Sequence, residues 1–144
     1  MELKAYLHKV QYYETDQMGV VHHSNYIRWF EEARVDFLEQ IGADYDAIER
    51  DGYISPVTSV SCDYKTMARF GDSVYIISKL ENFNGIKFKL SYKVIDTVSN
   101  EIKTIGESNH CFMNKEGKLV SLKKESKKYY DLFIEMVGRE TTVY

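Results

Sequence analysis

A strongly aromatic helical stripe, followed by a long stretch of strand-like sequence, limits the folds open to this chain. In residues 25–41, large apolar side chains recur at three- and four-residue spacing, and the stripe consists of Tyr26, Trp29, Phe30, Ala33, Phe37 and Ile41. A stripe this apolar is stable only when another layer of structure covers it. Gly42 supplies the expected stop. The pattern therefore predicts a long, heavily buried helix.

The sequence on either side of this helix alternates between apolar and polar residues, as strands do. Strands are predicted at residues 4–13, 57–64, 73–83, 86–94 and 102–113, and shorter helices at 44–50 and 123–136. The Asn84-Gly85 pair predicts a two-residue hairpin turn, because both residues tolerate a positive φ. The later strands are expected to form an antiparallel meander. Its apolar face needs a cover, and the only long apolar helix is the first, so we expect an α+β fold with the sheet wrapped around that helix.

Composition narrows the class of protein. A length of 144 residues favours a single domain over residues 1–144, and a net charge of −3 gives a nucleic-acid partner no general electrostatic support. No stretch approaches a membrane span, and the N-terminal residues lack the apolar core of a signal peptide. Two cysteines make no disulfide framework, so we expect a reduced, cytoplasmic protein in which Cys62 is buried packing.

The segment between the first strand and the long helix contains the parts of an acyl-transfer site. Asp16 offers a carboxylate just ahead of a buried helix, and Gly19 permits a positive φ or a close approach to a ligand. The helix N-terminus presents free main-chain N–H groups and a partial positive charge, which stabilise an oxyanion. On these grounds alone, the commoner interpretation is that Asp16 is a turn residue, Gly19 a kink and His23 part of a helix cap, because Asp and Gly are frequent in turns.

The same segment carries a recognisable motif. It runs Thr15-Asp16, Gly19-Val20-Val21, His22-His23 and Tyr26, and the similarity continues through residues 26–34 and Ala68-Arg69-Phe70-Gly71-Asp72. Over roughly residues 10–120, the chain resembles the hot-dog-fold acyl-CoA thioesterases of the 4-hydroxybenzoyl-CoA thioesterase/YbgC type. The resemblance implies a hot-dog fold, in which an antiparallel sheet wraps around a long central helix.

The resemblance also implies roles for particular residues. Asp16 aligns with the catalytic carboxylate, acting as nucleophile or general base, and His23 is the second catalytic residue, with its main-chain N–H polarising the thioester carbonyl. Positioning of the oxyanion and substrate is expected from Gly19, Val20, His22, Ser24 and Tyr26, and contacts with the CoA phosphates from Arg69 and Lys65. Two positions depart from the usual motif. Glu14 stands where Asp is commoner, and we expect this replacement to have no effect on function. His22 stands where Tyr is frequent.

The implied activity is hydrolysis of an acyl-CoA to the free acid and CoA. Coenzyme A is then part of the substrate, and we expect no metal and no organic cofactor, since adjacent histidines cannot act as the i, i+4 ligands of a helical zinc site. The resemblance implies a homodimer, commonly extended to a tetramer, with active sites at the dimer interface. Three alternatives stay open: a thioesterase for acyl carrier protein, a non-catalytic acyl-CoA-binding module, and a hot-dog dehydratase or hydratase.

Overall fold

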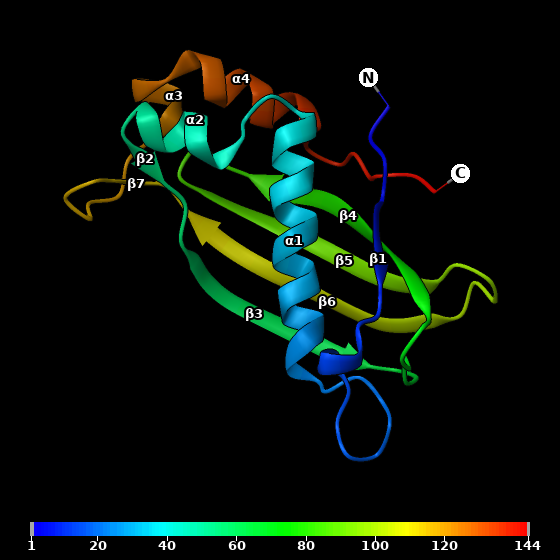
Figure 1. The fold of residues 1–144 in the computed structure, drawn as a ribbon. Coiled ribbons are helices and arrows are strands. Elements are labelled where there is room, and N and C mark those ends of the chain that lie inside the picture. Colours follow the sequence, from blue (N-terminus) through cyan, green and yellow to red (C-terminus); the bar gives the residue numbers. More distant parts are fainter. Residues whose placement is uncertain (1, 144) are drawn as a thin grey trace.

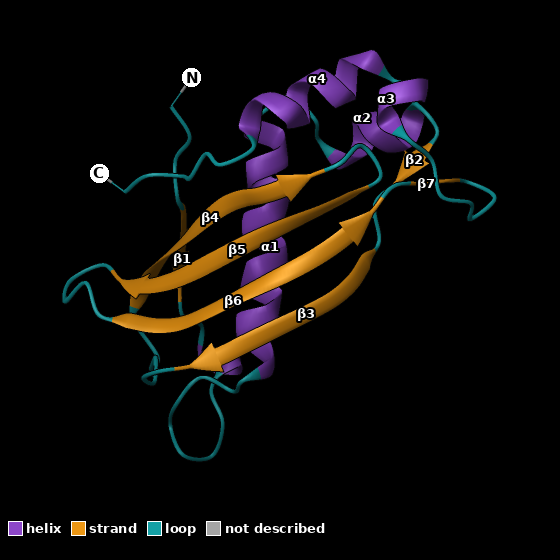
Figure 2. Cartoon of the chain, turned by 180° about the vertical axis from the view of Figure 1, so that it is seen from behind, coloured by secondary structure: helices purple, strands orange, loops and turns teal. Residues whose placement is uncertain are grey.

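The fold is a five-stranded antiparallel sheet curved around one long helix. The computed structural model describes residues 2–143. The strands are β1 (Tyr6–Lys9), β3 (Val57–Tyr64), β4 (Ser73–Phe83), β5 (Lys87–Asp96) and β6 (Ile102–Cys111), in the spatial order β1-β4-β5-β6-β3. Helix α1 (Ser24–Gln40) crosses one face of this sheet (Figure 1). In the described chain, no helix covers the opposite face (Figure 2). The predicted α+β arrangement is confirmed.

Helix α1 supplies the centre of the core. Trp29 has no exposed surface, and Phe30, Phe37 and the other members of the predicted stripe are buried with it. Along β4 and β5, alternate side chains are buried. Two of these buried side chains, Leu80 and Leu90, lie side by side because the two residues pair across β4 and β5. Each fully buried side chain of this size contributes ~1.5–3 kcal/mol, so the helix and the sheet stabilise each other. The helix ends as expected at Gly42, whose φ is +85°.

Smaller elements close one end of the sheet. They are α2 (Tyr45–Arg50), α3 (Leu122–Glu125), α4 (Lys127–Met136) and a two-stranded ribbon of β2 (Tyr53–Ile54) and β7 (Met113–Asn114). The prediction of one continuous helix over residues 123–136 is wrong. Ser126 is extended, with φ −149° and ψ 90°, and its side chain accepts a hydrogen bond from the Tyr129 N–H. A serine that caps a new helix cannot also continue the previous one.

Three further expectations need correction. The hairpin turn spans residues 84–87, with Gly85 and Ile86 at its centre, since the Asn84 N–H donates to the Lys87 carbonyl. Gly85 has a positive φ but Asn84 does not; the Asn84 Oδ1 accepts hydrogen bonds from the main-chain N–H groups of Ile86 and Lys87. The first strand is shorter than predicted, because the chain turns into a 3-10 helix, η1 (Tyr12–Glu14). Finally, β3 does not lie beside β4: it pairs with β6 and forms the far edge of the sheet.

Two of the predictions from composition can also be compared with the structure. Among residues 2–143, no helix is long and apolar enough to cross a membrane. Cys62 and Cys111 are both free thiols, and Cys111 is buried. Cys62 is half-buried on the edge strand, so its description as buried packing was too strong.

Gly106 on β6 lets α1 approach the sheet closely. A Cβ added at this position would lie 2.5 Å from the Phe30 ring and 2.5 Å from the Ser61 carbonyl oxygen. The Ser61 oxygen is main chain and cannot rotate away, so we expect Gly106→Ala to lower the free energy of unfolding by about 1–3 kcal/mol. Urea unfolding measures this. A Gly106→Ala variant as stable as the wild type would show that α1 and β3 can move away from β6 without a loss of folding free energy, which would contradict this expectation.

Candidate active site

The loop between η1 and α1 is a tight, internally bonded hairpin that projects beyond the sheet at the N-terminal end of α1 (Figure 1). Thr15 and Val21 form an antiparallel bridge. The Asp16 N–H donates to the Val20 carbonyl at 2.8 Å, and the Gly19 N–H donates to the Asp16 carbonyl at 3.1 Å. Gly19 has a φ of +78° with open space around its Cα, so the backbone conformation, and not a close contact, favours glycine there.

This hairpin orients the Asp16 carboxylate. Its Oδ1 accepts a hydrogen bond from the Met18 N–H at 2.8 Å, and the side chain is partly exposed. Asp16 lines an open depression of about 570 Å³ together with Tyr12, Tyr13, Thr15 and Gln17. The second carboxylate oxygen is therefore the one available to a substrate.

The start of α1 has one main-chain donor without a partner. The His22 N–H donates to the Glu14 carbonyl at 2.9 Å, and the Ser24 N–H donates to His22 Nδ1 at 3.2 Å. Between them, the His23 N–H has no hydrogen-bond partner in the described chain. His22 is thus the residue whose side chain caps the helix, and it also pairs with the Ser24 hydroxyl at 2.8 Å. The free donor is the one that the sequence predicts for an oxyanion.

The imidazole of His23 is exposed on the surface. Among the described residues, it makes no hydrogen bond with Asp16. Its ring stacks on that of His22 with the centroids 4.2 Å apart, and it meets the Tyr64 ring in a T-shaped arrangement with the centroids 6.2 Å apart. The Tyr64 hydroxyl donates to the His23 main-chain carbonyl at 3.2 Å. The end of β3 is therefore fastened to the start of α1, which places the following residue, Lys65, near the loop.

Tyr26 and Val20 are buried, and each contacts the segment between β3 and β4. The Tyr26 hydroxyl accepts a hydrogen bond from the Ala68 N–H at 3.2 Å, and burial raises the pKa of this phenol. Val20 forms an antiparallel bridge with Arg69. The first contact joins α1, and the second joins the loop, to the segment between β3 and β4. The structure thus brings Asp16, the His23 N–H, Lys65 and Arg69 to one end of the molecule.

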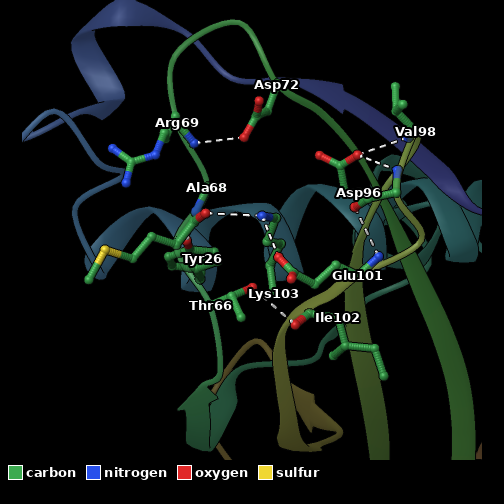
Figure 3. A network of polar contacts seen from close by, with 12 residues as sticks. Tyr26, Thr66, Ala68, Arg69, Asp72, Asp96, Val98, Glu101, Ile102 and Lys103 are labelled. Carbon is green, nitrogen blue, oxygen red and sulfur yellow. Dashed lines mark hydrogen bonds and ion pairs between the residues drawn. The ribbon is translucent and has the colours of Figure 1, made fainter.

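The segment that carries Lys65 and Arg69 is held by a residue that the sequence analysis missed. Lys103 is 8% exposed, and its ammonium donates to the Met67 carbonyl at 3.1 Å and to the Glu101 carboxylate at 3.0 Å (Figure 3). Asp72 accepts from the Arg69 N–H at 2.9 Å, while the Arg69 guanidinium extends away from it (Figure 3). The guanidinium is exposed and free to meet an anion.

A second missed residue is Glu14, whose side chain is the hub of the loop. Its carboxylate accepts hydrogen bonds from the Gln11 N–H at 2.8 Å, the Trp29 indole at 2.7 Å and His8 Nε2 at 2.8 Å. Its main-chain carbonyl accepts from the Asn25 side chain as well as from the His22 N–H. The expectation that a glutamate in place of aspartate has no effect at this position understates its structural role. No local sequence pattern predicts this role of Glu14, because its indole donor, Trp29, lies fifteen residues further along the chain.

Hydrogen bonding controls the charge of Glu14. Burial alone would raise the pKa of this carboxyl, but the donors from Gln11, Trp29 and His8, with the His8 charge, together lower it below its ordinary value. No group of three or more His, Cys, Asp or Glu side chains arranged to hold a metal lies among residues 2–143. The charged group at the centre of the loop is the Glu14 carboxylate, which the hydrogen bonds from Gln11, Trp29 and His8 stabilise.

The lowered pKa predicts how stability depends on pH. The ionised Glu14 stabilises the fold above its unfolded pKa of about 4.3, and this contribution is lost as the pH falls through the folded pKa. We expect Glu14→Gln to lower the free energy of unfolding at neutral pH by about 1.5–3 kcal/mol and to flatten its decline in acid. Urea unfolding at a series of pH values tests this. Glu32→Gln is the control, since Glu32 is exposed and lies 3.6 Å from His8; equal losses in the two variants would contradict the assignment.

Comparison with known proteins agrees with this geometry. Residues 10–139 match the sequence model of the thioesterase-like superfamily. The chain is 38% identical to a putative esterase of Aquifex aeolicus, over 83% of this chain and 91% of that one, and 32% identical to the putative acyl-CoA thioesterase YneP of Bacillus subtilis, over 75% and 78%. The DHNA-CoA thioesterase of Staphylococcus aureus superposes with a TM-score of 0.87 at 26% identity, covering 94% of this chain and 91% of that one. The chain belongs to the thioesterase-like superfamily and has its hot-dog fold.

Proposed function

We propose that this protein is a thioester hydrolase that cleaves an acyl-CoA to the free acid and CoA, with Asp16 as its catalytic carboxylate. One observation supports this most directly: a single short hairpin presents both the Asp16 carboxylate and the unpartnered His23 N–H at the start of α1. Similarity to proteins named acyl-CoA thioesterase and DHNA-CoA thioesterase supports the same reaction class.

The proposed reaction uses these two groups on opposite sides of the thioester carbonyl. The carboxylate of Asp16 either attacks the carbonyl carbon, giving a mixed anhydride that water then hydrolyses, or takes a proton from the water that attacks. In either route the carbonyl oxygen gains negative charge, which the His23 N–H and the positive end of the α1 dipole stabilise. The CoA thiolate is the leaving group, and water is the second substrate. The reaction requires no metal and no organic cofactor.

The remaining site residues position the substrate in this proposal. Gly19 and Val20 shape the hairpin, and His22 with Ser24 and the buried Tyr26 fixes the helix start. The exposed His23 imidazole is available to guide the thiol or return its proton. Arg69 and Lys65 are exposed cations on the adjoining segment, suited to the phosphates of CoA.

We also propose that the enzyme is a homodimer, joined through β3. This strand is an open edge of the sheet, and Val57, Val60 and Tyr64 on it are 47%, 39% and 48% exposed. An exposed, partly apolar edge strand tends to pair with another strand. The same strand ends beside the start of α1, so the partner would lie next to the active site. We place the enzyme in the reducing cytoplasm, in keeping with its two free thiols.

The first test of the proposal is Asp16→Asn. An asparagine Oδ1 can still accept the Met18 N–H, so the hairpin is retained while the base or nucleophile is lost. We expect kcat to fall by ~10²–10⁴-fold with acyl-CoA binding intact, measured by free-thiol release on short, long and aromatic acyl-CoAs. Asp131→Asn, on the distant helix α4, is the matched control.

The outcome separates the candidate functions. Activity of Asp16→Asn within about threefold of the wild type would refute the mechanism. Tight acyl-CoA binding by the wild type without hydrolysis would favour a non-catalytic binding module, and faster release from acyl carrier protein than from CoA would favour the carrier-protein substrate.

The dimer is tested by light scattering of the purified protein. We expect a mass of twice the chain, or four times if dimers pair further, which does not dissociate at the concentrations used for activity assays. A fully active monomer would contradict the proposed β3 interface.

A further inference from the structure

A small pocket lies between the middle of α1 and the edge strand β3, separate from the Asp16 hairpin. Its volume is about 80 Å³, and its lining includes Ile27, Phe30 and Arg34 from α1, Val60 from β3, and Tyr92 and Ser108 from the sheet beneath. This space suits a group of a few heavy atoms. The walls are largely hydrocarbon, and the polar groups come from Arg34, Tyr92 and Ser108, with Glu31 also part of the lining.

Arg34 carries a buried positive charge that the described residues compensate poorly. The residue is 6% exposed, and its Nε is buried with no hydrogen-bond partner among residues 2–143. The nearest carboxylate is that of Glu31, 3.9 Å from Nη2, on a side chain that is 67% exposed. The Tyr45 ring, 5.5 Å from the guanidinium carbon, adds only a cation–π contact. Buried guanidinium groups are normally matched by a carboxylate or phosphate with good geometry.

A chain of hydrogen bonds leads from this guanidinium to Tyr92, and the cation sets its direction. Arg34 Nη1 lies 3.2 Å from His110 Nδ1 and 3.5 Å from Nε2, and because a guanidinium can only donate, we assign the nearer Nδ1 as the acceptor and the proton to Nε2. With this assignment, Nε2 donates to Ser108 Oγ, 2.7 Å away, and the Ser108 hydroxyl donates to Tyr92 Oη, 2.6 Å away. Burial, followed by the charge of Arg34, lowers the pKa of His110 to about 3, which keeps the imidazole neutral and able to accept.

With this assignment, the Tyr92 hydroxyl proton has no acceptor among residues 2–143. Tyr92 and Arg34 both line the pocket, and the Arg34 guanidinium brings a positive charge whose enclosed Nε–H has no partner among the same residues. A hydroxyl or carbonyl group in the pocket could accept from Tyr92. A carboxylate accepts from Tyr92 and also neutralises the guanidinium.

We propose that this pocket binds a carboxylate at the far end of the acyl group, so that the enzyme prefers ω-carboxyacyl-CoA thioesters to plain acyl-CoAs of the same length. The inference rests on the proposed function, because it takes the thioester to lie at the His23 N–H. From His23 to Arg34 the helix rises ~16 Å. An extended acyl chain of about eight to twelve carbons covers ~9–14 Å of this distance, and the hydrogen bonds at its two ends, each ~3 Å long, make up the rest. The exposed Ile27 and Val60 lie along the way. An incoming carboxylate displaces Glu31 from its long contact with Arg34.

The test compares decanedioyl-CoA with decanoyl-CoA, together with the corresponding octanoyl and dodecanoyl pairs. Wild-type kcat/KM is measured for each, and binding is measured by calorimetry with Asp16→Asn, which holds the thioester without cleaving it. We expect the dioic thioester to be preferred by about tenfold or more in both measurements at the best chain length, the value of a charge-assisted hydrogen bond. Equal or weaker binding of the dioic member in every pair would overturn the inference.

Substitutions then locate the preference. Tyr92→Phe removes the hydroxyl but keeps the ring that stacks on Phe30 at 4.4 Å, and we expect it to lower the dioic-to-plain ratio several-fold. Arg34→Met should bring the ratio to about one. Tyr53→Phe is the matched control and should leave the ratio unchanged, because the Tyr53 hydroxyl donates to the Glu125 carbonyl and Tyr53 does not line the pocket. A ratio unaffected by Tyr92→Phe would place the preference elsewhere and overturn the inference, even if Arg34→Met fails to fold.

These measurements separate the two proposals. Preferential binding of the dioic thioesters without hydrolysis of any thioester would refute the proposed function and leave the pocket assignment standing. Hydrolysis of the plain acyl-CoAs without a dioic preference would do the reverse. Absence of both binding and hydrolysis in well-folded protein would overturn both.

Discussion

The hydrogen bonds of the buried Glu14 carboxylate hold together the end of the molecule that carries the candidate active site. It joins three parts of the chain that are separate in sequence: His8 on β1, the η1 turn through Gln11, and α1 through the Trp29 indole. A buried carboxylate with fewer donors would be costly to ionise, whereas three donors lower its pKa and keep it charged. The hairpin that presents Asp16 follows directly from this hub. Its geometry is therefore set by a neighbour that does not touch the substrate.

Helix α1 links the two regions of proposed chemistry. Its aromatic side packs into the curved sheet and fixes its position, so that its first turn can offer a free N–H at a defined place. Further along, the same helix places Arg34 over His110, where the sheet supplies a chain of neutral hydrogen-bonding groups. Gly106 permits this close approach. One rigid element thus relates the proposed position of the thioester to the proposed position of the far end of the acyl group, and the helix sets the distance between the two.

Local patterns predicted the elements well wherever the deciding forces are local. The stripe of α1, the alternation of β4 and β5 and the stop at Gly42 all depend on neighbours within a few residues. The errors have equally local causes that competed with the pattern: Ser126 caps a new helix, and the Asn84 side chain bonds its own turn. Strand order is different. The placement of β3 beside β6 depends on packing between distant segments, and the meander expected from chain order holds only for β4, β5 and β6.

By itself, the sequence determined the α+β class, the buried helix and the candidate carboxylate Asp16, because hydrophobic periodicity and a compact motif are written in consecutive residues. Tertiary structure alone decided that Glu14 and Lys103 hold the site, and that Arg34 lies against His110, 76 residues along the chain. These features depend on which donors and acceptors meet after folding. A buried polar group is satisfied by whatever the fold brings to it, and sequence spacing carries no record of that partner.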